Sequence, residues 1–181
     1  MKKILVILLA ALTLSFTGCM VQISPSASSE KSTSSGKPLT FEVTKEMKEK
    51  GNSPENTESL KSLSNLISKY PHLGAENDVS VLYSGLQWQN TNGEQYVAFF
   101  VINKTNATYK NMSFTLSMKV ADDIVLDGKK AMLSENVFGE IKPYVAKPLY
   151  VTLDDEHYSY LKNANNSNVK VSMADFKADS Q

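Results

Sequence analysis

The spacing of apolar residues changes along the chain, and each change marks a different kind of segment. Residues 4–17 carry no charge, whereas residues 20–37 contain seven serines and no apolar periodicity. From residue 54 apolar residues recur every three or four positions, and from residue 78 they alternate with polar ones. The first spacing indicates an amphipathic helix and the second indicates half-buried strands.

The helical spacing extends from about Pro54 to Tyr70. Proline suits the first position of a helix, and Pro71 prevents its continuation. The apolar stripe of this helix comprises Leu60, Leu63, Leu66, Ile67 and Tyr70. We expect the stripe to pack on the domain that follows, with docking onto another protein as the alternative. Before it, residues 39–43 alternate as a short strand does, and the charged segment 44–50 predicts one or two helical turns.

The C-terminal part of the chain predicts about seven short strands separated by turn residues. They cover residues 79–89, in two pieces (79–83 and 86–89) on either side of Gly85, and residues 95–103, 112–120, 124–126, 131–134, 149–153 and 169–176. Gly85 predicts a bulge or bend, Asn92-Gly93 a type I′ hairpin, and Asp127-Gly128 a second turn. Residues 96–102 are all apolar or aromatic, so that strand should be covered on both faces. The pattern favours a mainly β fold, an antiparallel immunoglobulin-like β-sandwich with one preceding amphipathic α-helix and with Trp88 in its core.

The N-terminal leader has the composition of a secretory signal peptide. Lys2 and Lys3 precede the uncharged stretch, which is too short to span a bilayer and long enough for a signal-peptide core. Phe16-Thr17-Gly18-Cys19 follows and holds the only cysteine of the chain. This arrangement resembles the lipobox of bacterial lipoprotein signal peptides. The resemblance implies cleavage before Cys19 and a diacylglycerol on its thiol; the alternative is an ordinary thiol in an uncleaved apolar N-terminus.

Lipidation of Cys19 would place the protein on the cell membrane, facing the extracytoplasmic side. Each buried methylene contributes ~0.8 kcal/mol, so two or more acyl chains hold a protein stably where one does not. The expected organisation is a signal peptide (1–18), a lipid-anchored flexible linker (19–38), a short strand with a helical arm (39–77) and the β-sandwich (78–177).

The charge balance argues against one class of partner. All 19 basic residues are lysines, and 19 acidic residues balance them. Removing the leader takes away two lysines and leaves a net charge of −2. A nearly neutral chain without arginine lacks the basic surface that nucleic acids require and the bidentate group that grips phosphate. We therefore expect no nucleic-acid partner.

Three motifs in the strand region are similar to those of a known domain family. They are Leu82-Tyr83-Ser84-Gly85-Leu86-Gln87-Trp88, Val101-Ile102-Asn103-Lys104-Thr105-Asn106, and Gly139-Glu140-Ile141-Lys142-Pro143-Tyr144 with Lys147-Pro148-Leu149. With the lead-in at residues 41–48, they resemble the SLAP domain, named after S-layer assembly proteins of Gram-positive bacteria. The resemblance covers about residues 39–160. It implies a role in envelope assembly or surface interaction, without defining a ligand.

Candidate catalytic and metal-binding residues are sparse. His157 follows Asp154-Asp155-Glu156, which suggests a base with an orienting carboxylate, but the nearby Ser159 has no nucleophile motif around it. The alternative interpretation is a solvated acidic loop. The two histidines, His72 and His157, are too far apart in sequence for a zinc motif, and the acids at residues 122–127 lack calcium-loop spacing. We expect no catalytic residue, no metal and no cofactor.

Tyrosines near the C-terminal half form the candidate interaction surface, because tyrosine combines an apolar ring with a hydrogen-bonding group. They are Tyr144, Tyr150, Tyr158 and Tyr160, and the alternative is that they are core residues. The sequence thus predicts a lipoprotein that serves as a non-catalytic interaction module in cell-envelope or surface-layer assembly or secretion, with an envelope or secreted protein as partner. The alternatives are a small envelope hydrolase that uses His157 and the adjacent acids, or a ligand-sensing or solute-binding lipoprotein.

Overall fold

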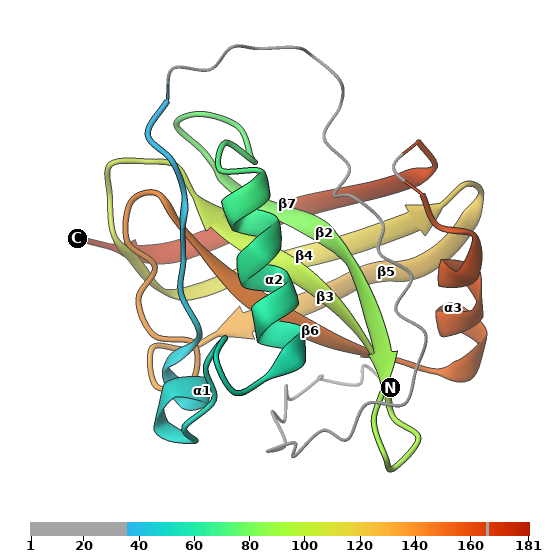
Figure 1. The fold of residues 1–181 in the computed structure, drawn as a ribbon. Coiled ribbons are helices and arrows are strands. Elements are labelled where there is room, and N and C mark those ends of the chain that lie inside the picture. Colours follow the sequence, from blue (N-terminus) through green and yellow to red (C-terminus); the bar gives the residue numbers. More distant parts are fainter. Residues whose placement is uncertain (1–35, 166) are drawn as a thin grey trace.

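The computed structural model describes residues 36–165 and 167–181, and there two β-sheets pack against each other (Figure 1). The predicted signal peptide, Cys19 and most of the predicted linker lie outside these residues. The elements in chain order are β1 (Thr40–Phe41), α1 (Lys45–Glu49), α2 (Glu58–Lys69), β2 (Val79–Gln89), β3 (Gln95–Asn103), β4 (Tyr109–Val120), β5 (Asp123–Leu133), β6 (Val145–Leu153), α3 (Asp155–Tyr160), a 3₁₀ turn (Leu161–Asn163) and β7 (Val169–Ser180). The predicted β-sandwich with a preceding amphipathic helix is confirmed.

The strands divide into a four-stranded sheet, β1-β6-β3-β2, and a three-stranded sheet, β5-β4-β7. All neighbouring strands are antiparallel except β1, which pairs parallel to β6. Constant-type immunoglobulin domains also divide seven strands into four and three, although their strand order is different. Within the described residues no helix is long and apolar enough to cross a membrane.

Strand β3 lies at the centre of both hydrophobic clusters. Eight of its nine residues are buried. Val97, Phe99 and Val101 face the second sheet and belong to the cluster between the sheets. Ala98, Phe100 and Ile102 point the other way, into a cluster that α2 completes. The prediction that this strand is covered on both faces is therefore confirmed.

Helix α2 lies across the outer face of the four-stranded sheet (Figure 1). Its residues Leu60, Leu63, Leu66 and Ile67 are each at most 2% exposed. The predicted stripe therefore packs on the sandwich. The helix begins at Glu58, later than predicted, because a polar turn occupies residues 51–57. In that turn Asn56 Oδ1 accepts from the Ser53 amide at 2.8 Å, and Asn56 Nδ2 donates to the Gly51 carbonyl at 2.7 Å.

The turn after β3 is fixed by buried polar side chains. Asn103 is fully buried and its Nδ2 donates to the carbonyls of Ala107 (2.8 Å) and Ile141 (3.1 Å). Lys104 is 1% exposed, forms an ion pair with Glu76, and donates to the His72 and Gly74 carbonyls, each at 3.4 Å. A buried lysine is tolerated when it is paired and hydrogen-bonded, so Lys104 fixes the α2–β2 connection onto the end of β3.

Two turn predictions were wrong in detail. The β2–β3 hairpin forms, but Asn92 has no positive φ, whereas a type I′ turn needs positive φ at both central residues. Instead the Gly93 amide donates to the Asn90 carbonyl at 3.0 Å, and Gly93 alone takes a φ of 82°. Asp127-Gly128 does not end a strand; it lies inside β5, where the Gly128 amide donates to Ser117 Oγ at 3.0 Å.

The structure also corrects the predicted position of Trp88. Between Tyr83 and Gln87, β2 advances four residues while β3 advances two, which confirms the bulge predicted at Gly85. Because the two extra residues leave the alternation unchanged, Leu86 and Trp88 stay on the outer face with Leu82. Trp88 is therefore half-buried on the side of α2 and does not lie between the sheets.

We expect Leu63→Asp to lower the free energy of unfolding by at least about 3 kcal/mol, because it places a charge without a partner in an apolar layer. Thermal unfolding followed by circular dichroism would measure the change. Asn65→Asp, at an exposed position of the same helix, is the matched control and should melt close to the wild type. An equal melting temperature for Leu63→Asp would contradict the packing of α2 on the sheet.

Candidate binding site at one end of the sandwich

The four predicted tyrosines do not form one surface. Tyr144 and Tyr150 pack against the cluster beneath α2, whereas Tyr158 and Tyr160, on α3, pack against the cluster between the sheets. Tyr144 lies in the turn just before β6, and Lys37 Nζ is 5.4 Å from its ring centroid. None of the four is fully exposed.

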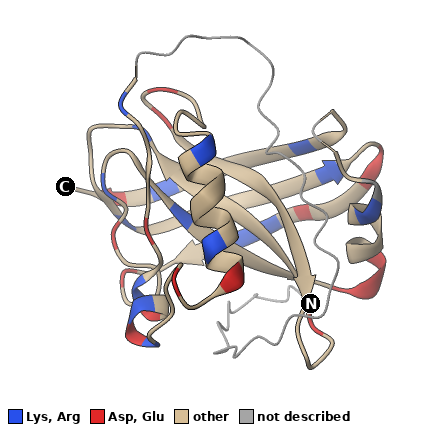
Figure 2. Ribbon diagram, in the orientation of Figure 1, with Lys and Arg blue, Asp and Glu red and all other residues tan. Residues whose placement is uncertain are grey.

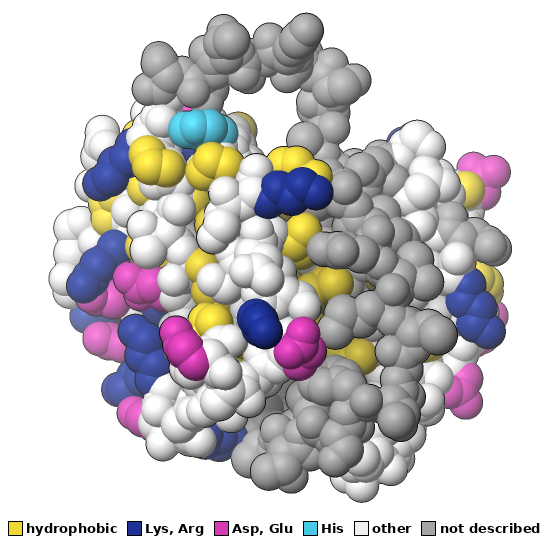
Figure 3. All heavy atoms as spheres, in the orientation of Figure 1, with side chains coloured by type: hydrophobic (Ala, Val, Ile, Leu, Met, Phe, Trp, Pro, Cys, Tyr) yellow, Lys and Arg dark blue, Asp and Glu magenta, His cyan; other side chains and the backbone are white. Residues whose placement is uncertain are grey.

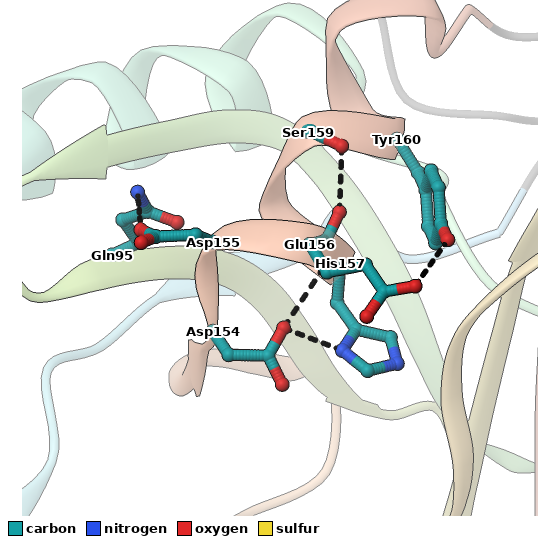
Figure 4. Close-up of polar contacts among 7 residues, drawn as sticks. All are labelled: Gln95, Asp154, Asp155, Glu156, His157, Ser159 and Tyr160. Atoms are coloured by element: carbon teal, nitrogen blue, oxygen red, sulfur yellow. Dashed lines mark hydrogen bonds and ion pairs between the residues drawn. The ribbon is translucent and has the colours of Figure 1, made fainter.

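His157 lies in the first turns of α3, close to the acids that precede it (Figure 4). Asp154 caps this helix: its Oδ1 accepts from the His157 amide at 2.9 Å and lies 2.6 Å from His157 Nδ1. These two hydrogen bonds from His157 lower the pKa of the Asp154 carboxyl. The residues therefore form a histidine–carboxylate pair whose geometry is that of a helix cap.

The neighbouring hydroxyl groups point elsewhere. Ser159 Oγ donates to the Glu156 carbonyl at 2.7 Å, within its own helix, and the Tyr160 hydroxyl donates to Glu156 Oε1 at 2.9 Å (Figure 4). The structure does not bring Ser159 into a hydrogen bond with His157, as a nucleophile and its base require. Within residues 36–165 and 167–181 no three His, Cys, Asp or Glu side chains are grouped as metal ligands.

A second set of residues stands out because buried polar groups normally have hydrogen-bond partners. In the described part of the chain, five buried side-chain polar atoms lack one: Tyr83 Oη, Gln87 Oε1, Trp88 Nε1, Gln95 Oε1 and Tyr150 Oη. All five residues belong to, or pair with, the first five residues of β3. The groups without partners are therefore concentrated at one end of the four-stranded sheet.

Two of these groups lie on the outer face of the sheet, at the N-terminal end of α2. Trp88 stacks on Tyr96 with ring centroids 5.7 Å apart and planes at 15°, and it meets Tyr150 edge-on at 4.9 Å. Burial raises the pKa of the Tyr150 hydroxyl, and the neighbouring Ser59 side chain, in the first turn of α2, opposes that rise only in part. Burial and the Glu94 carboxylate raise the pKa of Tyr96 to about 12.

The other three groups face the second sheet, beneath α3. Tyr83 is 3% exposed, and burial, aided by the nearby Tyr158, raises its pKa. Gln95 Nε2 donates to Asp155 Oδ1 at 2.8 Å, which ties α3 to the start of β3 and leaves the other end of that amide without a partner (Figure 4). Chemically, this end of the sandwich combines aromatic rings with buried hydrogen-bonding groups that have no partner among the described residues.

Among the residues at this end, the sequence pointed to Tyr150 and Tyr158 as candidate site residues but not to Tyr83, Gln87, Trp88, Tyr96 or Gln95. One feature of the sequence could have identified part of this end. Gln87 and Gln95 are polar residues at strand positions that face the core, where alternation calls for apolar side chains. Their proximity depends on the pairing register of β2 with β3, which alternation alone does not give.

No protein-family model matches this chain, and it matches neither a curated protein nor a solved structure.

Lys147 is the one other buried ionisable group whose charge is strongly affected in the described residues. It is 4% exposed, and its Nζ donates to the Phe138 carbonyl at 3.2 Å and lies 5.6 Å from the centre of that ring. Burial lowers the pKa of Lys147 to about 8, although Glu42 opposes the shift. This amine holds the 134–139 turn against β6.

We expect Lys147 to make stability rise with pH. Between about pH 8 and its ordinary pKa of 10.5, the folded amine is neutral while the unfolded one still binds a proton, so raising the pH favours the folded state. The gain should be about 1 kcal/mol once solvent screening is allowed for. Urea unfolding of the wild type and Lys147→Met at pH 7.5, 8.5 and 9.5 would measure it. Equal slopes of stability against pH in both proteins would contradict this assignment.

Proposed function

We propose that this protein is a lipid-anchored, non-catalytic interaction module on the extracytoplasmic side of a bacterial cell membrane. It would serve cell-envelope or surface-layer assembly or secretion, with an envelope or secreted protein as its partner. The membrane is engaged through the lipid on Cys19. The lipobox and the resemblance to the SLAP domain support this location and class.

The observation that carries the proposal is the set of partnerless polar groups at one end of the sandwich. An interface needs hydrogen-bonding groups next to apolar anchors, and tyrosine and tryptophan supply both. Tyr150 and Trp88 are half-buried beside α2, and Tyr158, on α3, is half-buried at the same end. Lysines and acidic residues are both spread over the two sheets and the helices, and neither sign of charge gathers in one large region (Figure 2). Electrostatic attraction of a polyanion is therefore not the basis of the proposed binding.

The histidine–carboxylate pair on α3 favours a second candidate, the small envelope hydrolase. His157 Nδ1 and Asp154 Oδ1 are 2.6 Å apart, which would orient the imidazole as a base. Against this, Ser159 is engaged with the Glu156 carbonyl. The pair therefore fits a helix cap better than a catalytic centre.

Cross-linking of the intact protein on living cells, followed by mass spectrometry, tests the proposed function. We expect a defined envelope or secreted protein to be captured by the anchored protein. The Cys19→Ala variant, which lacks the acylated thiol, should be released from the membrane fraction and lose that capture. Capture of nothing beyond abundant bystanders, or equal capture by the unanchored variant, would argue against the proposal.

His157→Ala separates the interaction module from the hydrolase. Because the side chain is at the surface, we expect its removal to change stability by no more than about 0.5 kcal/mol and to leave the captured partner unchanged. A hydrolase would instead lose turnover of its substrate while keeping its fold. Measuring capture and hydrolysis of envelope material on the same preparations would decide between the two.

A further inference from the structure

The three-stranded sheet β5-β4-β7 has one face toward the core and one toward solvent. Along β4, Phe114, Leu116 and Met118 point into the core, whereas the residues between them point outward. The register of β5 and β7 with β4 shows which residues share this outer face, and all of them are exposed or half-buried. They are Ser113, Thr115, Ser117 and Lys119 of β4, Ile124, Lys130 and Met132 of β5, and Lys170, Ser172, Ala174 and Lys177 of β7.

Lysines outnumber acids on this outer face. None of its four lysines forms an ion pair with a described residue. Asp175 lies on the same face and accepts from Thr115 Oγ1 at 3.1 Å, and Asp179, near the end of β7, accepts from Asn111 Nδ2 at 2.8 Å. On the side of the molecule that carries α2, by contrast, lysine and acidic side chains lie next to one another (Figure 3). The outer face is therefore locally basic although the chain is nearly neutral.

Two of these lysines are cross-strand neighbours. Lys119 lies directly opposite Lys170, and like charges in this position destabilise a sheet. The acids nearest in sequence do not lie between them: Asp123 pairs with Val120 and shares its inward face, and Asp122 lies in the turn at the end of the sheet. Stability alone would favour an acid at one of the two lysine positions. The pair is therefore suited to an anionic partner outside the domain.

Exposed apolar side chains accompany the lysines. Ile124 is 43% exposed and Met132 is 63% exposed, and they are two of the three large apolar side chains that are exposed in the described residues. Both lie on the edge strand β5, and Ile124 is opposite Lys119. A soluble acidic chain would neutralise the lysines and leave these side chains against water. A lipid surface accommodates both kinds of group, because its anionic headgroups lie directly above the acyl chains.

We propose that the outer face of the β5-β4-β7 sheet is a docking surface for the anionic headgroups of the membrane. Each lysine near such a surface strengthens binding about fivefold. Weak contacts suffice, because a domain held by a lipid is already at high effective concentration, and the predicted linker (19–38) spans about 25 Å as a flexible coil. The inference rests on the proposed function for the presence of a membrane, and it adds a second membrane contact that orients the domain.

Vesicle binding by the chain without its lipid tests this surface directly. We would use residues 19–181 with Cys19→Ala, which retain every residue of the two hydrophobic clusters. Co-sedimentation should show binding to vesicles of phosphatidylglycerol and phosphatidylcholine that is at least about tenfold tighter than to phosphatidylcholine alone. Raising the salt concentration from about 0.1 M to about 0.5 M should weaken it, because salt screens exposed charges.

Two charge-reversed variants separate this face from net charge. Lys119→Glu with Lys170→Glu should weaken binding to the anionic vesicles at least about tenfold, because two favourable contacts become repulsive. Lys61→Glu with Lys69→Glu makes the same change in net charge at exposed positions of α2, on the other side of the molecule, and should stay within about threefold of the parent. Circular dichroism would confirm that both variants are folded.

A fluorescent label reports which side meets the lipid. Because Cys19 is the only cysteine, Met132→Cys in the Cys19→Ala chain gives one site for an environment-sensitive dye. Its emission should shift to the blue on anionic vesicles. The same dye at Asn65→Cys, an exposed position of α2, should not shift.

No preference for anionic vesicles, equal loss in the two charge-reversed variants, or an equal shift of the two labels would each overturn the inference. Tighter binding to soluble polyglutamate than to vesicles would also overturn it and assign the face to an acidic macromolecule. These outcomes are independent of the cross-linking experiment. Partner capture without vesicle binding would overturn this inference alone, and vesicle binding without partner capture would overturn the proposed partner alone.

Discussion

The double-sided burial of β3 is the constraint on which the rest of the structure depends. A strand whose two faces are both apolar cannot lie at the surface of a sheet that is open to water. The second sheet covers one face, and α2 must cover the other, since Phe100 and Ile102 would otherwise be exposed. The helix that precedes the sandwich is therefore a part of its core. The buried Lys104, at the end of β3, holds the connection between the helix and β2 in place.

The polar groups without partners appear where this coverage ends. Buried amides and hydroxyls cost free energy when they are unpaired, about 1–3 kcal/mol each. A chain selected for stability alone would place apolar side chains at Gln87 and Gln95, as it does at the neighbouring inward positions Val97 and Val151. Their concentration at one end, on both faces of the same strands, marks that end as the part of the sheet that is not optimised for stability. The opposite end, around Asn103, shows the contrast, because its buried amide is fully used.

Local patterns predicted the elements well, and long-range pairing explains where they failed. Apolar residues at every third or fourth position predicted α2, the unbroken apolar run at residues 96–102 predicted β3 and its burial, and the alternation of apolar and polar residues predicted β4. Asp127-Gly128 has the composition of a turn, but pairing with β4 and the bond to Ser117 keep β5 continuous through it. The face occupied by Trp88 and the meeting of Trp88 with Tyr150 follow from how β2, β3 and β6 align. That alignment joins residues 62 positions apart in the sequence, and spacing within a single segment cannot give it.

The parallel pairing of β1 has a mechanical consequence for a domain held from its N-terminal side. Tension applied there would reach β1 and the residues beside it first, where the backbone hydrogen bonds include Leu39 to Pro71, Thr40 to Tyr144 and Glu42 to Ala146. Such a pull would load this short pairing before it reached α2, because β1 precedes α2 in the chain. Strand β1 is therefore the first paired strand that a force from the N-terminal side would have to separate from the sheet, and its two-residue pairing with β6 is far shorter than those among β2, β3 and β6.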